Sequence, residues 1–207
     1  MDGALASVGA FFLTSLAIEL TPGPNMAYLA LVGVSRGRSD GMMAVAGVAL
    51  GLLLLGAVVG VGLGSLILEN RAIYQGVRWG GAAYLVWLAY DAWRDGQRDV
   101  VVDEIFDRSW LFFRRGFVTN LLNPKAALFY VTVLPSFIEA GRSTASQTTW
   151  LVLVYVTAAT LVHTAIVLAS SVLAPLFQRP QLRRQAGVFF ALTLIGVAIW
   201  LLLKTAG

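Results

Sequence analysis

Two long stretches without a charged side chain limit what this chain can fold into. Residues 41–68 form a run of 28 residues, and residues 143–178 a run of 36, that contain no Asp, Glu, Lys or Arg. A helix needs about 20 apolar residues to cross the hydrocarbon core of a bilayer, so either run is long enough to span it. The chain is 58% hydrophobic and 13% charged, which excludes an ordinary soluble domain and predicts a membrane protein.

The apolar segments predict an all-α membrane protein, a single transmembrane transporter domain over residues 1–207. The start at Met1 lacks a basic segment and a cleavage site, so the first apolar stretch is interpreted as a membrane helix and not as a signal peptide. The absence of cysteine excludes disulfides and thiolate metal sites. The six expected spans cover about residues 5–34, 42–68, 73–90, 117–138, 150–173 and 187–203.

Basic residues are unevenly distributed between the expected connections. The loops after the first, third and fifth spans hold ten arginines, whereas the opposite side holds four basic residues. Cytoplasmic loops carry such an excess, so these three loops are expected in the cytoplasm and both termini in the periplasm. The net charge of +4 is explained by these arginines, and no nucleic-acid partner is expected.

The longest expected connection, residues 91–115, is predicted to be a cytoplasmic loop. Its acidic residues could suggest a metal cluster, but basic residues are interspersed among them, as is typical of a solvated loop. The sequence therefore predicts neither a metal site nor a bound cofactor. The acidic residues in question are Asp99, Asp103, Glu104 and Asp107.

Both the first and the fourth expected span are interrupted by polar residues and proline. The first contains Glu19-Leu20-Thr21-Pro22-Gly23-Pro24-Asn25, and its prolines cannot continue a helix. In the fourth, Asn123 and Pro124 favour a new helix start just before Lys125. A broken backbone at membrane depth survives only where it is buried in protein or lines a wet cavity. We therefore expect broken first and fourth helices.

The two interruptions divide the chain into pseudo-repeats of about residues 1–90 and 111–207. With three spans each, the halves enter the membrane from opposite sides. Interruptions at corresponding positions of two inverted repeats indicate a secondary transporter with a midplane site. The restarted helices direct positive dipole ends towards a carboxylate, and the preceding helix ends offer carbonyls to an ammonium group. The expected substrate is a small zwitterion, moved by alternating access.

The candidate site residues all lie in the interruptions, apart from one histidine. Glu19 inside a span costs on the order of 3 kcal/mol unless it is paired or hydrated, so it is interpreted as a proton carrier or an ammonium ligand; a capping charge at the membrane surface is the alternative. Lys125 either holds the substrate carboxylate or pairs with Glu19. His163 suits proton coupling or a hydrogen bond between helices. The substrate-binding candidates are Glu19, Thr21, Pro22, Gly23, Pro24, Asn25, Asn120, Asn123, Pro124 and Lys125, and the proton-coupling candidates are Glu19 and His163.

Asparagines and glycines in these spans have two interpretations each. The asparagines of the interruptions either cap the broken helices or contact substrate. The glycines of the second span, mostly four residues apart, allow another backbone to approach closely. That contact lies either within the chain or between two protomers. The glycines are Gly47, Gly51, Gly56, Gly60 and Gly64.

The order of these motifs resembles that of the lysine exporter (LysE/RhtB) family. The resemblance lies in TPGPN followed by Ser35-Arg36-Gly37-Arg38, and in Arg115-Gly116-Phe117 leading into NPKAALF and Leu134-Pro135. It covers essentially the whole chain and implies a proton-driven exporter of amino acids or close derivatives in the bacterial inner membrane, acting as a homodimer. It does not fix the substrate. The residues on family motif positions are Pro22, Gly23, Pro24, Asn25, Asn123, Pro124 and Lys125.

An intramembrane enzyme and a passive channel are the alternative functions. The chain has no HExxH or GxSxG motif and no intramembrane aspartate pair that would supply a nucleophile or an activated water. It also lacks the ring of like charges or the repeated filter motif of a channel. The sequence therefore predicts an exporter and not an enzyme.

Overall fold

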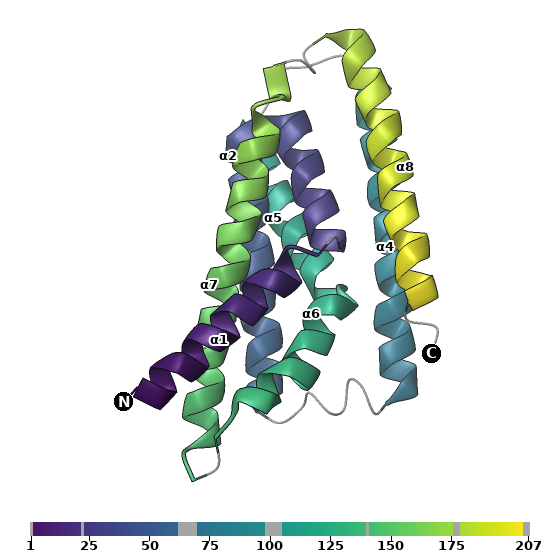
Figure 1. Cartoon of the computed structure of the whole chain (residues 1–207). Coiled ribbons are helices and arrows are strands. Elements are labelled where there is room, and N and C mark those ends of the chain that lie inside the picture. The colour runs from purple at the N-terminus through teal and green to yellow at the C-terminus, as the bar shows by residue number, and fades with distance from the viewer. Residues whose placement is uncertain are drawn as a thin grey trace.

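The computed structural model describes residues 2–21, 23–61, 70–97, 105–139, 141–175 and 179–204. All the regular secondary structure of these residues is helical, which confirms the all-α prediction (Figure 1). The elements are α1 (Asp2–Glu19), α2 (Pro24–Gly60), α4 (Arg71–Gln97), α5 (Ile105–Leu121), α6 (Pro124–Leu128), the π-helical turn η1 (Phe129–Val133), the 3₁₀ turn η2 (Leu134–Phe137), α7 (Thr144–Ser171) and α8 (Pro180–Lys204).

The first predicted interruption is present. Helix α1 ends at Glu19, and α2 begins at Pro24, where proline is favourable because the first N–H groups of a helix have no partner within it. Helix α2 then bends at Gly37, whose φ of 81° and ψ of −165° lie outside the helical region. The prediction of a loop between residues 34 and 42 is therefore wrong. The two parts of α2 are joined directly at Gly37, where the helix bends.

The second predicted interruption is also present. The segments Ser109–Leu121 and Pro124–Phe137 are bent by 51° at the break between them. The side chain of Asn123 accepts a hydrogen bond from the backbone N–H of Lys125 (3.0 Å) and so caps α6. Beyond Leu128 the helix continues through η1 and η2 to Phe137.

The predicted loop over residues 91–115 is wrong at both ends. Helix α4 continues to Gln97 and α5 begins at Ile105, while the intervening residues lie outside the described part of the chain. The start of α5 is amphipathic: Phe112 is buried, whereas Trp110 and Arg114 are exposed. Charged residues on the exposed face interrupt the apolar sequence of this segment. The segment was therefore not predicted as a helix from continuous apolar runs.

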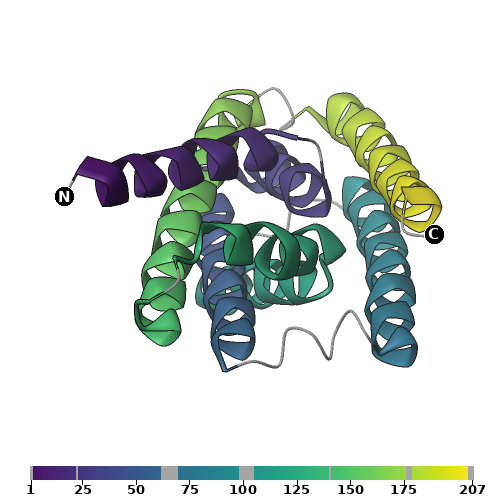
Figure 2. The same cartoon turned by 60° about the horizontal axis from the view of Figure 1, so that its bottom comes forward.

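The helices form a central group and a lateral pair. Helices α2, α5 and α7 pack closely together, and α1 and α6 cover the lower half of this group as drawn (Figure 1). Helices α4 and α8 pack along each other at one side, as the rotated view also shows (Figure 2). An ion pair between Asp91 and Arg115 (2.6 Å) connects α4 to α5, and the Arg115 guanidinium lies 4.9 Å from the ring centre of Trp87.

The glycines of α2 pack inside the chain. A Cβ added at Gly47 would overlap the Phe113 carbonyl of α5, and one added at Gly116 of α5 would overlap the Ala44 carbonyl of α2. Gly56 faces Val152 of α7. The internal alternative is therefore confirmed for Gly47, Gly51 and Gly56, whereas Gly60 is exposed and Gly64 lies outside the described residues.

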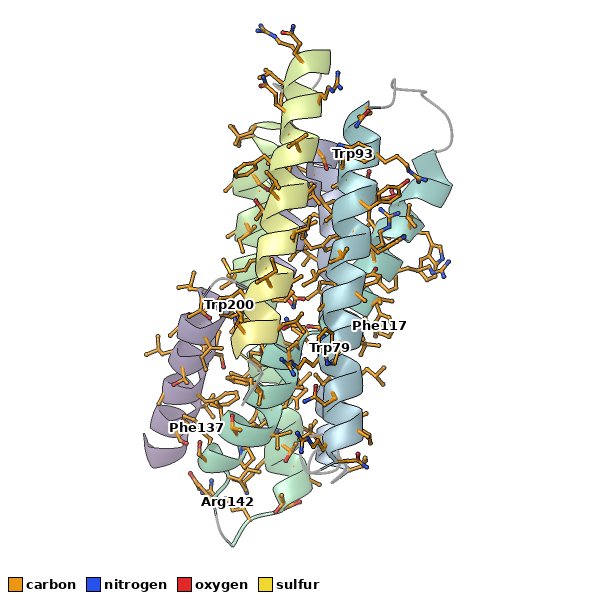
Figure 3. All side chains as sticks on the ribbon, turned by 90° about the vertical axis from the view of Figure 1, so that its right-hand side faces the viewer. Trp79, Trp93, Phe117, Phe137, Arg142 and Trp200 are labelled. Carbon is orange, nitrogen blue, oxygen red and sulfur yellow. The ribbon has the colours of Figure 1, made fainter. Side chains whose placement is uncertain are left out.

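Large apolar side chains cover the outer surface, as expected of a protein surrounded by lipid. Trp79, Trp93 and Trp200 lie exposed on α4 and α8 (Figure 3). Among the described residues, α2 and α7 are long and apolar enough to cross a membrane, and the bent pair Ser109–Leu121 and Pro124–Phe137 qualifies as one broken span. Shorter apolar helices cover Ser7–Glu19 and Arg184–Trp200. The count of six spans stays a prediction.

Candidate functional site

The two helix interruptions meet near the middle of the molecule (Figure 1). The amide Nδ2 of Asn25, in the first turn of α2, donates a hydrogen bond to Oδ1 of Asn120 in the last turn of α5 (2.9 Å). Both side chains are buried, at 4% and 0% exposure. Two segments that lie 95 residues apart in the sequence are thus in direct polar contact.

Each asparagine of this contact has a second polar atom without a hydrogen-bond partner. These are Oδ1 of Asn25 and Nδ2 of Asn120, and both atoms are buried. A buried polar group left unpaired costs about 1–3 kcal/mol, so such atoms need an explanation, often a ligand or water. The pair offers one acceptor, which suits an ammonium group, and one donor, which suits a carboxylate.

Lys125 reaches from the second interruption to the first. Its Nζ donates a hydrogen bond to the backbone carbonyl of Thr21 (2.8 Å), and a Cβ added at Gly23 would lie 3.4 Å from its Cδ. The ammonium group has three donors, and this contact uses one of them. Lys125 is partly buried and Thr21 is exposed, so the remaining donors can reach a carboxylate.

Glu19 is bound to helix α7. Its Oε1 accepts a hydrogen bond from the Tyr155 hydroxyl (2.6 Å), and its Oε2 lies 3.2 Å from Nε2 of His163. Glu19 is 4% exposed and His163 1%. Its carboxylate is therefore buried in protein and not exposed at the surface of the molecule, and its depth in the membrane stays a prediction.

The direct pairing of Glu19 with Lys125 is wrong for this conformation. The ion pairs among the described residues place Glu19 against His163, and Lys125 instead binds a carbonyl of the first interruption. His163 contacts α1 through the 3.2 Å approach of Nε2 to Oε2 of Glu19, but Nε2 has no hydrogen-bond partner, so the predicted hydrogen bond between helices stays a prediction. Its role in proton coupling stays a prediction.

Two tyrosines of the site were missed by the sequence analysis. The ring of Tyr155 stacks on Phe129 at 3.9 Å and meets Tyr130 edge-on at 5.1 Å. The Tyr130 hydroxyl donates to the carbonyl of Leu52 (2.9 Å). A buried tyrosine hydroxyl usually needs a hydrogen-bond partner. Tyr155 lies in an apolar run two helical turns before His163, and this position could have indicated a polar contact there.

The other candidates have mostly structural positions. Asn123 caps α6, which confirms the capping role, while Pro24 and Pro124 each begin a helix. Contact of Asn123 with substrate stays a prediction. Pro22 lies outside the described residues. The same holds for Asp99, Asp103 and Glu104, and the side chain of Asp107 is not described either. Within the described part of the chain, no group of three or more His, Cys, Asp or Glu residues could hold a metal ion.

Comparison with known proteins identifies the family. The model of the LysE type translocator family matches residues 16–205, which include both interruptions, the end of α1 and the other helices that form the site. The chain belongs to this family. Membership confirms the resemblance seen in the sequence, and it confirms that the chain is a membrane translocator and not an enzyme.

Several relatives are named as amino-acid efflux proteins. The chain is 31% identical over 139 residues to a homoserine/homoserine lactone efflux protein of Salmonella typhimurium, covering 67% of this chain and 68% of that protein. It is 29% identical over 171 residues to a threonine efflux protein of Escherichia coli, covering 80% and 79%. A match to an uncharacterized membrane protein of Vibrio cholerae, 32% identical over 134 residues, covers 64% of this chain and 65% of that protein, just under two thirds of its length. No solved structure matches.

Proposed function

We propose that this protein exports amino acids or close derivatives across the bacterial inner membrane, driven by entry of protons. The observation that carries the proposal is the contact of the two interruptions at Asn25 and Asn120, which leaves one buried acceptor and one buried donor unpaired. The relatives named for efflux of homoserine and threonine support the substrate class.

The unpaired groups suggest how a zwitterion would bind. Its ammonium group takes Oδ1 of Asn25, and its carboxylate takes Nδ2 of Asn120 and the ammonium of Lys125. The positive dipole ends of α2 and α6 favour the carboxylate at the same place. Glu19 is not needed as a direct ligand, since both of its oxygens already have partners on α7.

The packing of the helices supports alternating access. Inverted repeats over residues 1–90 and 111–207 would pair the third span with the sixth and the second with the fifth. Helix α4 does pack on α8, and α2 packs on α7. Rocking of one repeat against the other would then expose the site to each side in turn.

The orientation proposed from the arginines also fits the shape of the molecule. The last turn of α7 and the first turn of α8 lie at the end of the molecule opposite the start of α1 and the end of α8 (Figure 1), and the connection between these turns belongs to the arginine-rich set. We place both termini in the periplasm on this basis. Dimerisation stays a prediction, since the glycines of α2 that could have formed an interface pack inside the chain.

Counterflow in proteoliposomes tests this proposal. Wild-type protein is expected to exchange one or a few labelled amino acids, whereas Lys125→Ala should fold and lose most of this exchange. Arg142→Ala removes an exposed surface cation and serves as the matched control with unchanged exchange. A passive channel would not accumulate label by counterflow. Absence of exchange of every amino acid by folded, reconstituted wild-type protein would overturn the proposal.

A further inference from the structure

We propose that the coupling proton is carried by Glu19 and His163, at a site separate from the amino-acid site at Asn25 and Asn120. This inference rests on the proposed function and names the groups that perform its proton step. It comes from a difference between two buried polar clusters. At one, a carboxylate accepts a hydrogen bond from a tyrosine hydroxyl and lies 3.2 Å from an imidazole nitrogen, while at the other two amide atoms have no hydrogen-bond partner.

Glu19 and His163 lie at the distance of an ion pair. Oε2 of Glu19 and Nε2 of His163 are 3.2 Å apart, and two bare acceptors would repel each other at this distance. A hydrogen on one of the two atoms relieves this repulsion. With Glu19 ionised and the imidazole neutral the pair has a charge of −1, and one further proton, on either group, brings it to zero. The Tyr155 hydroxyl donates to Oε1 and can do so in both states.

The location of the pair suits protons better than an amino acid. The side chains of Glu19 and His163 lie between α1 and α7 and are almost completely buried, with 6% and 1% of the side-chain surface exposed. A carboxylate inside a membrane protein persists where it is paired and where a function retains it. A proton can reach such a pair through transient water, whereas an amino acid would have to separate α1 from α7.

The charged and titratable neighbours explain how the proton and the substrate would exclude each other. The other titratable groups near Glu19 are Lys125 of α6, Tyr130 of η1 and Tyr155 of α7. Without the extra proton, the negative pair and the positive Lys125 give the region no net charge, which matches a zwitterion. With the proton bound, the region is positive, and this disfavours the substrate ammonium. Proton binding thus favours substrate release, as exchange of one for the other requires.

Proton release on substrate binding tests the inference directly. Detergent-solubilised wild-type protein in weakly buffered solution is expected to release about one proton per bound amino acid, using an amino acid found by counterflow. Binding of the proton and binding of the amino acid are linked equilibria. The affinity of the protein for the amino acid should therefore fall about tenfold for each unit of decreasing pH over the range in which the proton binds. Glu19→Gln should release no proton, and its affinity should be low and independent of pH. Glu139→Gln, which changes a more exposed carboxylate, should behave as wild type.

A second variant keeps the test decisive if Glu19→Gln does not fold. In His163→Gln the amide can still donate to Oε2 but cannot accept a proton, so the pH dependence of substrate affinity should shift to lower pH. A His163→Gln profile that matches wild type would overturn the assignment of the pair. Exchange by wild-type protein without proton release would overturn the inference and leave amino-acid transport standing. Absence of exchange would overturn the proposed function itself.

Discussion

Replacing Gly47 by alanine tests whether the close contact of α2 with α5 stabilises the fold. The added Cβ would lie 2.8 Å from the carbonyl carbon of Phe113 and 2.9 Å from the nitrogen of Phe117, and it would overlap the Phe113 carbonyl oxygen. These are backbone atoms, so no flexible side chain can move aside. The two helices must separate by several tenths of an ångström, which also disturbs the reciprocal contact at Gly116.

The expected cost follows from the kind of atoms involved. Overpacking costs about 1–3 kcal/mol, and we take about 3 kcal/mol because both partners are backbone. Alanine recovers about 1 kcal/mol of helix propensity, which leaves a net loss of about 2 kcal/mol. At about 2–4 °C per kcal/mol for a chain of this size, the thermal midpoint in detergent should fall by about 4–8 °C.

Gly196→Ala is the matched control for this prediction. Gly196 lies in α8, and an added Cβ there would meet no atom within 4 Å. The same substitution should therefore raise the midpoint by about 2–4 °C through helix propensity alone. Equal shifts for the two variants, measured by intrinsic fluorescence or by size-exclusion after heating, would refute the packing argument.

Three further sets of substitutions test contacts of buried side chains, each by the thermal midpoint in detergent. Tyr130→Phe removes the donor to the Leu52 carbonyl and should lower the free energy of unfolding by about 1 kcal/mol. Asn123→Ala removes the cap of α6 and should cost about 0.5–2 kcal/mol, with Asn123→Ser retaining most of the stability. Reversing either charge of the largely buried pair Asp91 and Arg115 should destabilise by about 3–5 kcal/mol, and reversing both should restore much of the loss.

Each of these has a clear contradicting result. A Tyr130→Phe variant as stable as wild type would mean that water replaces the lost partner. Equal midpoints for the alanine and serine variants at Asn123 would show that the cap is not what stabilises α6. A double reversal no more stable than the single reversals would show that Asp91 and Arg115 act through other neighbours.

The parts of the fold that depend on backbone chemistry were predictable from the sequence. Proline cannot continue a helix, so the breaks before Pro24 and Pro124 followed directly. Capping by Asn123 was one of its two predicted roles and follows from an equally local rule, whereas the burial of Glu19 was only one of two alternatives. The amphipathic start of α5 was missed because charges on one face of a helix interrupt any continuous apolar run.

The partners of Glu19 could not be predicted, for a different physical reason. Tyr155 and His163 lie on a helix 136 or more residues away, and sequence periodicity does not say how far one apolar helix is rotated against another. In a membrane helix the lipid-facing and protein-facing sides are both apolar, so the usual contrast between faces is weak. The contact of Asn25 with Asn120 was missing for the same reason, although both were candidates.

The pairing of α1 with α7 has a consequence for how the chain is made. Glu19 is synthesised 136 residues before Tyr155, which at about 5–20 residues per second is an interval on the order of 10 s. During that time the carboxylate has neither partner, and water, headgroups or protonation must accommodate it. We therefore expect α1 to enter the bilayer incompletely stabilised and to become anchored only when α7 has been made. Ribosome stalling before Tyr155 should leave α1 extractable, and a chain released after His163 should not.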